Sequence, residues 1–274
     1  QYLKWIFFSK KIFLPPQKSK VLIYDSSLKN SIECYLKEWD PETLNIRCES
    51  LNIFIFLRSL FRKSGKLFSN YVDEYIEYVK PMLILTLTDN RSDFYNISVR
   101  HQKIKTLFIQ NALRGTSSFS KEAINKFKNN KKRFKVDYMC VHSEVAGNNY
   151  KKFIEGTPIY IGSLKNNHVP KKKCSNKNTI GFISHFRSKY SPGFKSNVFS
   201  HTNGIVLKFL VEYAKKNKKN IQIICNTNTN DEKKFFRDHL DSSDFCFINQ
   251  PNRYGYSSYN AIDKVEVVIG MGST

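Results

Sequence analysis

Acidic side chains closely follow several apolar runs of this sequence. Asp89 comes shortly after the apolar run Met82–Leu87 and precedes Asn90. A carboxylate at the rim of a cleft is the group that takes a proton from a substrate hydroxyl, so Asp89 is our first candidate for a general base. Asp25 and Glu144 follow other apolar runs and compete for the same role.

A second group of polar residues could hold a substrate. Arg114 comes shortly after the apolar run Thr106–Ile109, and its planar fork of N–H donors suits a phosphate or an acidic sugar. The final Ser273 and Thr274 would offer backbone N–H groups and hydroxyls to a diphosphate. Each of these polar residues could instead cap a helix. The other candidates for binding are Asn90 and Asn111 in the first half, and Ser184, His185, Arg187 and Thr227 in the second half.

Familiar cofactor and metal patterns are absent from the sequence. No G-x-G-x-x-G follows a predicted strand, and there is neither a phosphate loop nor a nucleophile elbow, which disfavours nicotinamide, flavin and acyl-transfer sites. The six cysteines and six histidines show no metal-binding spacing. We therefore predict no cofactor and no metal, so that N–H groups, hydroxyls and cations offset the charge of any bound diphosphate.

Short apolar runs and longer amphipathic runs alternate along the chain. The short runs predict strands at 20–24, 44–48, 82–87, 106–109, 136–141, 158–161, 179–183, 221–225, 245–248 and 265–269. The longer runs predict helices at 31–38, 51–61, 68–79, 204–217, 231–240 and 257–262. This rhythm is typical of a doubly wound α/β fold with parallel sheets, in which ligands bind outside the carboxyl ends of the strands. The candidates above lie at or near such ends.

The rhythm is interrupted by the polar and basic stretch Leu164–Asn178. We interpret this stretch as a linker and predict two Rossmann-like domains, at 1–165 and 166–274. Position 1 is Gln rather than Met, and the last predicted strand runs into a small-residue loop with no helix after it. A strand without its following helix is an unusual end for an α/β domain, so we expect a second domain that is incomplete at its C-terminus.

The charge of the chain implies an anionic partner. Its 45 Lys and Arg residues against 23 Asp and Glu residues give a formal net charge of +22. Nucleic acid, an acidic membrane surface and phosphate-bearing substrates all fit such a balance. The positive residues are spread along the whole length, and the sequence has no helix-turn-helix, zinc or RNP-type motif. We therefore predict that nucleic acid is not the partner.

The opening segment Tyr2–Leu14 is aromatic, apolar and basic. It could lie on a membrane surface, or it could pack on the first domain as an ordinary amphipathic segment. No apolar stretch is long enough to span a membrane, and the cysteines have the pattern of a protein from a reducing cytosol. We predict a cytoplasmic protein with peripheral contact at the inner membrane surface.

Short pieces spread in order over nearly the whole chain resemble bacterial surface-carbohydrate biosynthesis proteins. These are transferases of the GT-B type encoded with lipopolysaccharide, O-antigen and capsule genes. In the family, an Asp-Ser-Thr-Leu-Gly-like turn follows the last strand, whereas here Gly272 takes the place of the Asp and the sequence ends at Thr274. That departure puts donor binding by this chain in question. The matching pieces are 20–25, 80–90, 104–111 with Arg114, 136–138, 161–163, 181–184 with Arg187, and 258–263 leading into 265–274.

The resemblance implies an enzyme that moves a sugar from a nucleotide-activated donor to a surface glycan or a lipid-linked acceptor. It also implies that the first domain binds the acceptor and the second binds the donor nucleotide. On that basis Asn90, Asn111 and Arg114 are candidates for acceptor binding. The donor candidates are Ser184, His185, Arg187, Thr227, Ser273 and Thr274.

Three other functions remain open at this point. A nucleotide-sugar 2-epimerase on the same fold would need the donor site but no acceptor groove. A polyol-phosphate transferase of the teichoic-acid type would suit the basic surface and an acidic polymer. A nucleic-acid-binding protein is suggested by the charge alone and ranks well below the other two, because the sequence has no nucleic-acid-binding motif.

Overall fold

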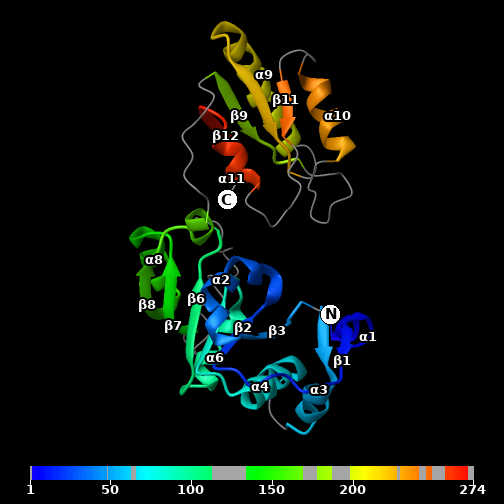
Figure 1. Cartoon of the computed structure of the whole chain (residues 1–274), viewed down its shortest axis with the longest axis vertical. Coiled ribbons are helices and arrows are strands. Elements are labelled where there is room, and N and C mark those ends of the chain that lie inside the picture. The colour runs from blue at the N-terminus through cyan, green and yellow to red at the C-terminus, as the bar shows by residue number, and fades with distance from the viewer. Residues whose placement is uncertain are drawn as a thin grey trace. The chain divides into compact units, whose positions relative to one another are not determined.

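The computed structural model describes residues 2–47, 49–62, 66–112, 134–168, 178–186, 198–226, 229–240, 245–248 and 257–270 (Figure 1). The chain forms two compact units, Gln1–Leu164 (unit 1) and Lys165–Thr274 (unit 2). Each unit has its own parallel sheet and its own hydrophobic core. None of the helices in these ranges is long and apolar enough to cross a membrane.

Unit 1 is built on a six-stranded sheet with the order β3-β2-β5-β6-β7-β8, in which every pairing is parallel. Within this sheet the first strand along the chain is β2. The next strand, β3, pairs on one side of β2, and β5 then pairs on the other side. The topological switch point, where a doubly wound sheet binds its ligand, therefore lies between β2 and β5. The strands are β2 (Val21–Tyr24), β3 (Glu42–Leu44), β5 (Leu83–Thr86), β6 (Lys105–Ile109), β7 (Phe134–Val141) and β8 (Ile154–Tyr160).

Helices cover both faces of this sheet because its strands are apolar on both sides. Along β2, Leu22 and Tyr24 join the larger core cluster, whereas Val21 and Ile23 join a smaller cluster. The larger cluster includes Tyr71 and other residues of α4, a helix that is buried over most of its length. The helices are α1 (Tyr2–Phe8), α2 (Glu33–Leu36), α3 (Ile53–Leu60), α4 (Leu67–Val79), α5 (Ser92–Tyr95), α6 (Ile97–Arg100) and α8 (Glu144–Lys151), with 3-10 turns at Ser26–Ser31, Lys37–Trp39 and Leu164–His168.

A separate two-stranded parallel ladder joins the start of the chain to the middle of unit 1. It consists of β1 (Lys10–Ile12) and β4 (Ser50–Asn52). Trp5 fixes α1 beside this ladder, because its indole N–H donates to the Ser50 carbonyl at 3.2 Å. Its ring lies edge-on to Tyr71, with 4.7 Å between the ring centroids.

Unit 2 has a four-stranded parallel sheet with the order β11-β10-β9-β12. Phe182, Ile223 and Phe236 are central to its core. Gly181 allows β9 to lie close to Val265, two residues before β12, because a Cβ at position 181 would be only 2.8 Å from Val265 Cγ2. The elements are β9 (Thr179–Ile183), α9 (Val198–Lys216), β10 (Asn220–Ile224), α10 (Asn230–His239), β11 (Phe245–Ile248), α11 (Ser257–Ile262) and β12 (Val267–Gly270).

The parallel sheets confirm the predicted α/β fold class, and most predicted elements lie within a few residues of the observed ones. The region before α4 differs. The predicted strand 44–48 is replaced by β3, which ends at Leu44, and β4, which begins at Ser50. The predicted helix 51–61 starts two residues later, because the Asn52 side chain caps α3 by accepting from Ile55 N at 3.1 Å. The predicted helix 31–38 is a short helix between 3-10 turns.

Candidate functional site

Two polar residues meet at the switch point of unit 1. Asp25 directly follows β2, and Thr88 lies two residues beyond the end of β5. The Thr88 hydroxyl donates to the Asp25 carboxylate at 2.8 Å. Arg47, from the loop after β3, donates to the same carboxylate from Nε at 2.7 Å and to Thr88 Oγ1 at 3.1 Å. We call Asp25, Arg47 and Thr88 the switch-point cluster.

The switch-point cluster is buried at one end and open at the other. The Asp25 side chain is 0% exposed, whereas the Arg47 side chain is 45% exposed. Asp25 also has a φ of 84°, a left-handed backbone that is uncommon outside glycine and that concentrates at functional sites. The Asp25 carboxylate and the Thr88 hydroxyl therefore hold the Arg47 guanidinium in one orientation, and the Arg47 side chain remains accessible. Such a group suits a phosphate or a carboxylate of a substrate.

Asp89, the first candidate for a base, lies one residue further along and is 0% exposed. Its carboxylate accepts a hydrogen bond from the Tyr150 hydroxyl, and its backbone carbonyl accepts one from the Tyr95 hydroxyl at 2.5 Å. Both tyrosines are buried in the core. In this geometry the carboxylate faces the interior, where it positions the end of β5 against α5 and α8. A role for Asp89 as a base stays a prediction.

The other candidates in unit 1 that the structure describes lie along the same edge of the sheet. Glu144 is exposed in the first turn of α8, where its charge favours the positive end of the helix dipole. Asn90 is exposed beside Asp89. Asn111 has a buried Oδ1 with no hydrogen-bond partner among the described residues. Arg114 lies outside the described residues.

In unit 2, Ser184 belongs to a hydrogen-bonded cluster at the carboxyl ends of β9 and β10. Its hydroxyl donates to the carboxylate of Glu232 and accepts from Phe186 N at 3.1 Å. The same carboxylate accepts from Asn226 N at 2.8 Å. Glu232 is fully buried and lies in the first turn of α10, which Thr229 caps by accepting from Glu232 N at 3.3 Å. These contacts fix the loops after β9 and β10 next to each other.

Sequence reasoning missed Glu232, although the pattern Thr229-x-x-Glu232 is the signature of a capped helix start. It also missed Arg47, for which no local signal exists. Among the predicted donor residues, Ser184 is held in the cluster just described, and His185 is half-buried next to it in the chain. Arg187, Thr227, Ser273 and Thr274 lie outside the described residues, so their grouping stays a prediction.

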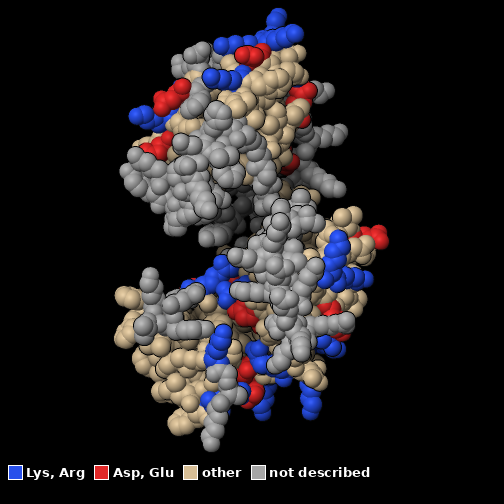
Figure 2. Space-filling model, turned by 180° about the vertical axis from the view of Figure 1, so that it is seen from behind, with Lys and Arg blue, Asp and Glu red and all other residues tan. Residues whose placement is uncertain are grey.

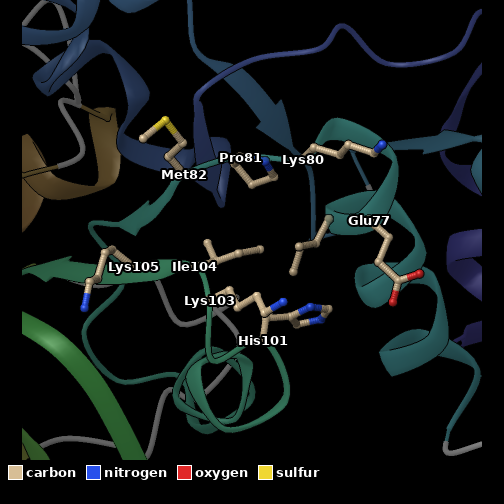
Figure 3. A pocket seen from close by; sticks show the side chains of 9 residues that line it. Glu77, Lys80, Pro81, Met82, His101, Lys103, Ile104 and Lys105 are labelled. Carbon is tan, nitrogen blue, oxygen red and sulfur yellow. The ribbon is translucent and has the colours of Figure 1, made fainter.

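A hollow of about 510 Å³ lies at the opposite, amino-terminal edge of the unit 1 sheet (Figure 3). Figure 3 shows Pro81 and Ile104 together with the basic side chains of His101 and Lys103. The hollow contains none of the predicted site residues. It lies at the amino-terminal edge of the sheet, whereas the switch point lies at the carboxyl ends of the strands. In the described part of the chain, no group of three or more His, Cys, Asp or Glu side chains could hold a metal ion.

Solved structures of two UDP-N-acetylglucosamine 2-epimerases are similar to the chain. The Neisseria meningitidis enzyme, solved bound to UDP-GlcNAc, has a TM-score of 0.52 and 13% identity over 91% of this chain and 76% of that chain. The Rickettsia bellii enzyme has a TM-score of 0.51 and 15% identity over 96% of this chain and 74% of that chain. Likeness at this identity shows the fold alone, and it confirms the predicted GT-B-like fold of two Rossmann-like domains.

No match is found among curated proteins. A family model described as "putative O-antigen biosynthesis protein" matches residues 107–274. The match covers more than half of the 274 residues and includes the last strands of unit 1 and all of unit 2. It also confirms the resemblance to surface-carbohydrate biosynthesis proteins that the sequence pieces indicated. The chain belongs to this family of O-antigen biosynthesis proteins.

Proposed function

We propose that the protein is a glycosyltransferase that moves a sugar from a nucleotide-activated donor to a glycan or lipid-linked acceptor of O-antigen synthesis. The observation that carries the proposal is the membership of a GT-B-like chain in an O-antigen biosynthesis family. Building an O-antigen requires that activated sugars be joined to an acceptor, and the fold has two Rossmann-like domains for the two substrates. The cytoplasmic location predicted from the sequence belongs to this proposal.

In this proposal unit 1 contacts the acceptor and unit 2 contacts the donor. The accessible guanidinium of Arg47 would bind a phosphate or an acidic group of the acceptor, because Asp25 and Thr88 hold it in one orientation. In unit 2, the loops that Ser184 and Glu232 fix would present backbone N–H groups to the donor diphosphate. Neither contact requires a metal.

A second candidate function is a nucleotide-sugar 2-epimerase. The likeness to two UDP-N-acetylglucosamine 2-epimerases favours it. The two reactions differ in what they consume and in which bond they break. A transferase breaks the bond between the sugar and the diphosphate and needs an acceptor hydroxyl. An epimerase breaks and remakes a C–H bond at C2 and needs no acceptor.

Product analysis of the full chain separates the two functions. The protein is incubated in D₂O with nucleotide sugars, with and without a membrane fraction that contains the lipid-linked glycan. We expect nucleoside diphosphate to be released and label to enter the glycan only when the acceptor is present. Acceptor-independent incorporation of deuterium at C2 of the sugar would instead identify an epimerase. Absence of both products with every nucleotide sugar would contradict both functions.

A further inference from the structure

Large apolar side chains are exposed on α1, on α3 and directly after β1 and α3. These elements lie near one another at one corner of unit 1 (Figure 1). Phe8 is 83% exposed and Phe61 is 87% exposed. An isolated exposed apolar residue is ordinary, but a contiguous group marks an interaction surface. We call the group the apolar patch, and its members are Phe7, Phe8, Phe13, Leu14, Leu57, Leu60 and Phe61.

The apolar patch is held in place by buried contacts on its inner side. On α3, Ile55 and Ser59 are buried, so Leu57, Leu60 and Phe61, which are spaced i, i+3 and i+4, lie on the outer face. On α1, Trp5 occupies the inner side. The Asn52 side chain donates to the Leu14 carbonyl at 2.8 Å and so ties that residue to the start of α3. These side chains therefore stay exposed on a fixed framework.

Positive charge accompanies the apolar patch. Lys10 and Lys11 lie in the chain between Phe8 and Phe13, and Lys10 is exposed with no ion pair among the described residues. The nearby Arg58 and Arg62 are neutralised by ion pairs with Glu74 and Glu77 of α4. On the face shown in Figure 2, the lower left part of the molecule has few charged side chains among the described residues. The patch thus combines apolar rings with uncompensated lysine charge.

We propose that the apolar patch docks unit 1 on an anionic lipid bilayer. Phenylalanine and leucine side chains enter the boundary between headgroups and acyl chains, and lysines beside them are attracted to anionic headgroups. A second copy of this chain is a poorer occupant, because a two-fold interface would bring Lys10 and Lys11 close to the same residues of the other copy. The formal net charge of +22 adds a long-range attraction to an anionic surface.

Flotation of the full chain with lipid vesicles tests the proposal. We expect binding to vesicles of phosphatidylcholine and phosphatidylglycerol, weaker binding to phosphatidylcholine alone, and a loss of binding at high salt. Phe8→Ser and Phe61→Ser should each bind about tenfold more weakly, because each removes one ring from the lipid boundary. The matched control is Phe209→Ser on α9 of unit 2, where the Phe is 63% exposed. It should bind as the unchanged protein does.

Variants of charged residues test the electrostatic attraction, and sedimentation measures self-association of the protein. Lys10→Glu should weaken binding to the anionic vesicles, whereas Lys216→Glu on the exposed end of α9 should have a smaller effect. Thermal unfolding checks that each variant is folded, which we expect because all replaced side chains are exposed. The proposal is overturned if the unchanged protein does not bind anionic vesicles, or if Phe8→Ser and Phe61→Ser bind normally. It is also overturned if these variants abolish self-association instead, which would make the patch an interface between copies.

Discussion

Arg47 is the most accessible member of the switch-point cluster, and its neighbours determine where its guanidinium points. Asp25 was predicted as a strand-end residue because its strand is a continuous apolar run, and Thr88 directly precedes the predicted Asp89. Arg47 could not be predicted, because it reaches them from the loop after β3, and only the pairing of β3 with β2 brings that loop to the switch point.

We predict that Arg47→Ala lowers kcat/KM by about tenfold or more, because the variant loses one charge-assisted hydrogen bond to a substrate. We also expect the free energy of unfolding to fall by about 1–3 kcal/mol, since the buried Asp25 loses a charged partner. Initial rates and urea unfolding measure the two effects. Arg58→Ala is the matched control, because Arg58 pairs with Glu74 rather than with the cluster. Similar losses of activity in both variants would exclude the cluster from the site.

The position of Asp89 at the end of a strand does not determine the direction of its side chain. The sequence locates the residue at the end of β5 but does not say whether its side chain points outward or inward. That direction depends on Tyr150, which lies 61 residues further along the chain. The structure turns the carboxylate inward, which favours a positioning role.

We predict that Asp89→Asn and Tyr150→Phe each lower the free energy of unfolding by about 1–3 kcal/mol, because each disrupts one buried hydrogen bond. Urea unfolding and initial rates on both variants provide the measurement. If Asp89 acts as a base, Asp89→Asn will instead lose about 10²–10⁴-fold in rate while Tyr150→Phe loses far less. Glu144 and Asp25 are then the weaker candidates.

Among the elements of unit 1, α4 and the end of α6 are joined by an ion-paired group. Asp73 on α4 accepts from Arg100 Nε at 2.9 Å and lies 2.8 Å from His101 Nε2. Burial raises the pKa of Asp73, but the hydrogen bond from His101 and the charge of Arg100 outweigh burial and lower the pKa below the ordinary value of an aspartate. A carboxyl whose pKa is lowered on folding stabilises the fold fully above its unfolded pKa. That contribution is lost as the pH falls through the folded pKa.

We predict that Asp73→Asn lowers the free energy of unfolding at about pH 7 and that the difference from the unchanged protein shrinks towards about pH 3. Urea unfolding at a series of pH values measures the difference. Glu212→Gln, which removes an exposed carboxylate of α9, is the control. It should change the free energy of unfolding less than Asp73→Asn does, both at about pH 7 and at about pH 3. A difference that stays constant with pH would contradict the ion-paired role of Asp73.

The elements of this fold differ in how clearly the sequence marks them. Strands β5, β9 and β11 were predicted almost residue for residue, since buried parallel strands are continuous apolar runs bounded by polar residues. The strands β1 and β4 were not predicted. Each has three residues, β1 contains two lysines, and their pairing depends on contacts distant in sequence.

In the whole molecule, the two units have separate cores, and Phe108 and Phe236 are fully buried in unit 1 and unit 2 respectively. We predict two transitions in calorimetric unfolding. Phe236→Ala should destabilise one of them by about 3–5 kcal/mol and leave the other in place, because the lost contacts belong to a single core. Phe108→Ala is the matched variant and should shift the other transition. A single transition that moves in both variants would contradict independent units.

The ladder between β1 and β4 also determines when the first part of the chain can fold during synthesis. Trp5 leaves the ribosome 45 residues before Ser50, which accepts its indole N–H. Pairings between residues so distant in sequence form later than local helices, because a long loop must first be closed. The indole ring of Trp5 therefore remains uncovered on the growing chain until β4 and then Tyr71 have been synthesised.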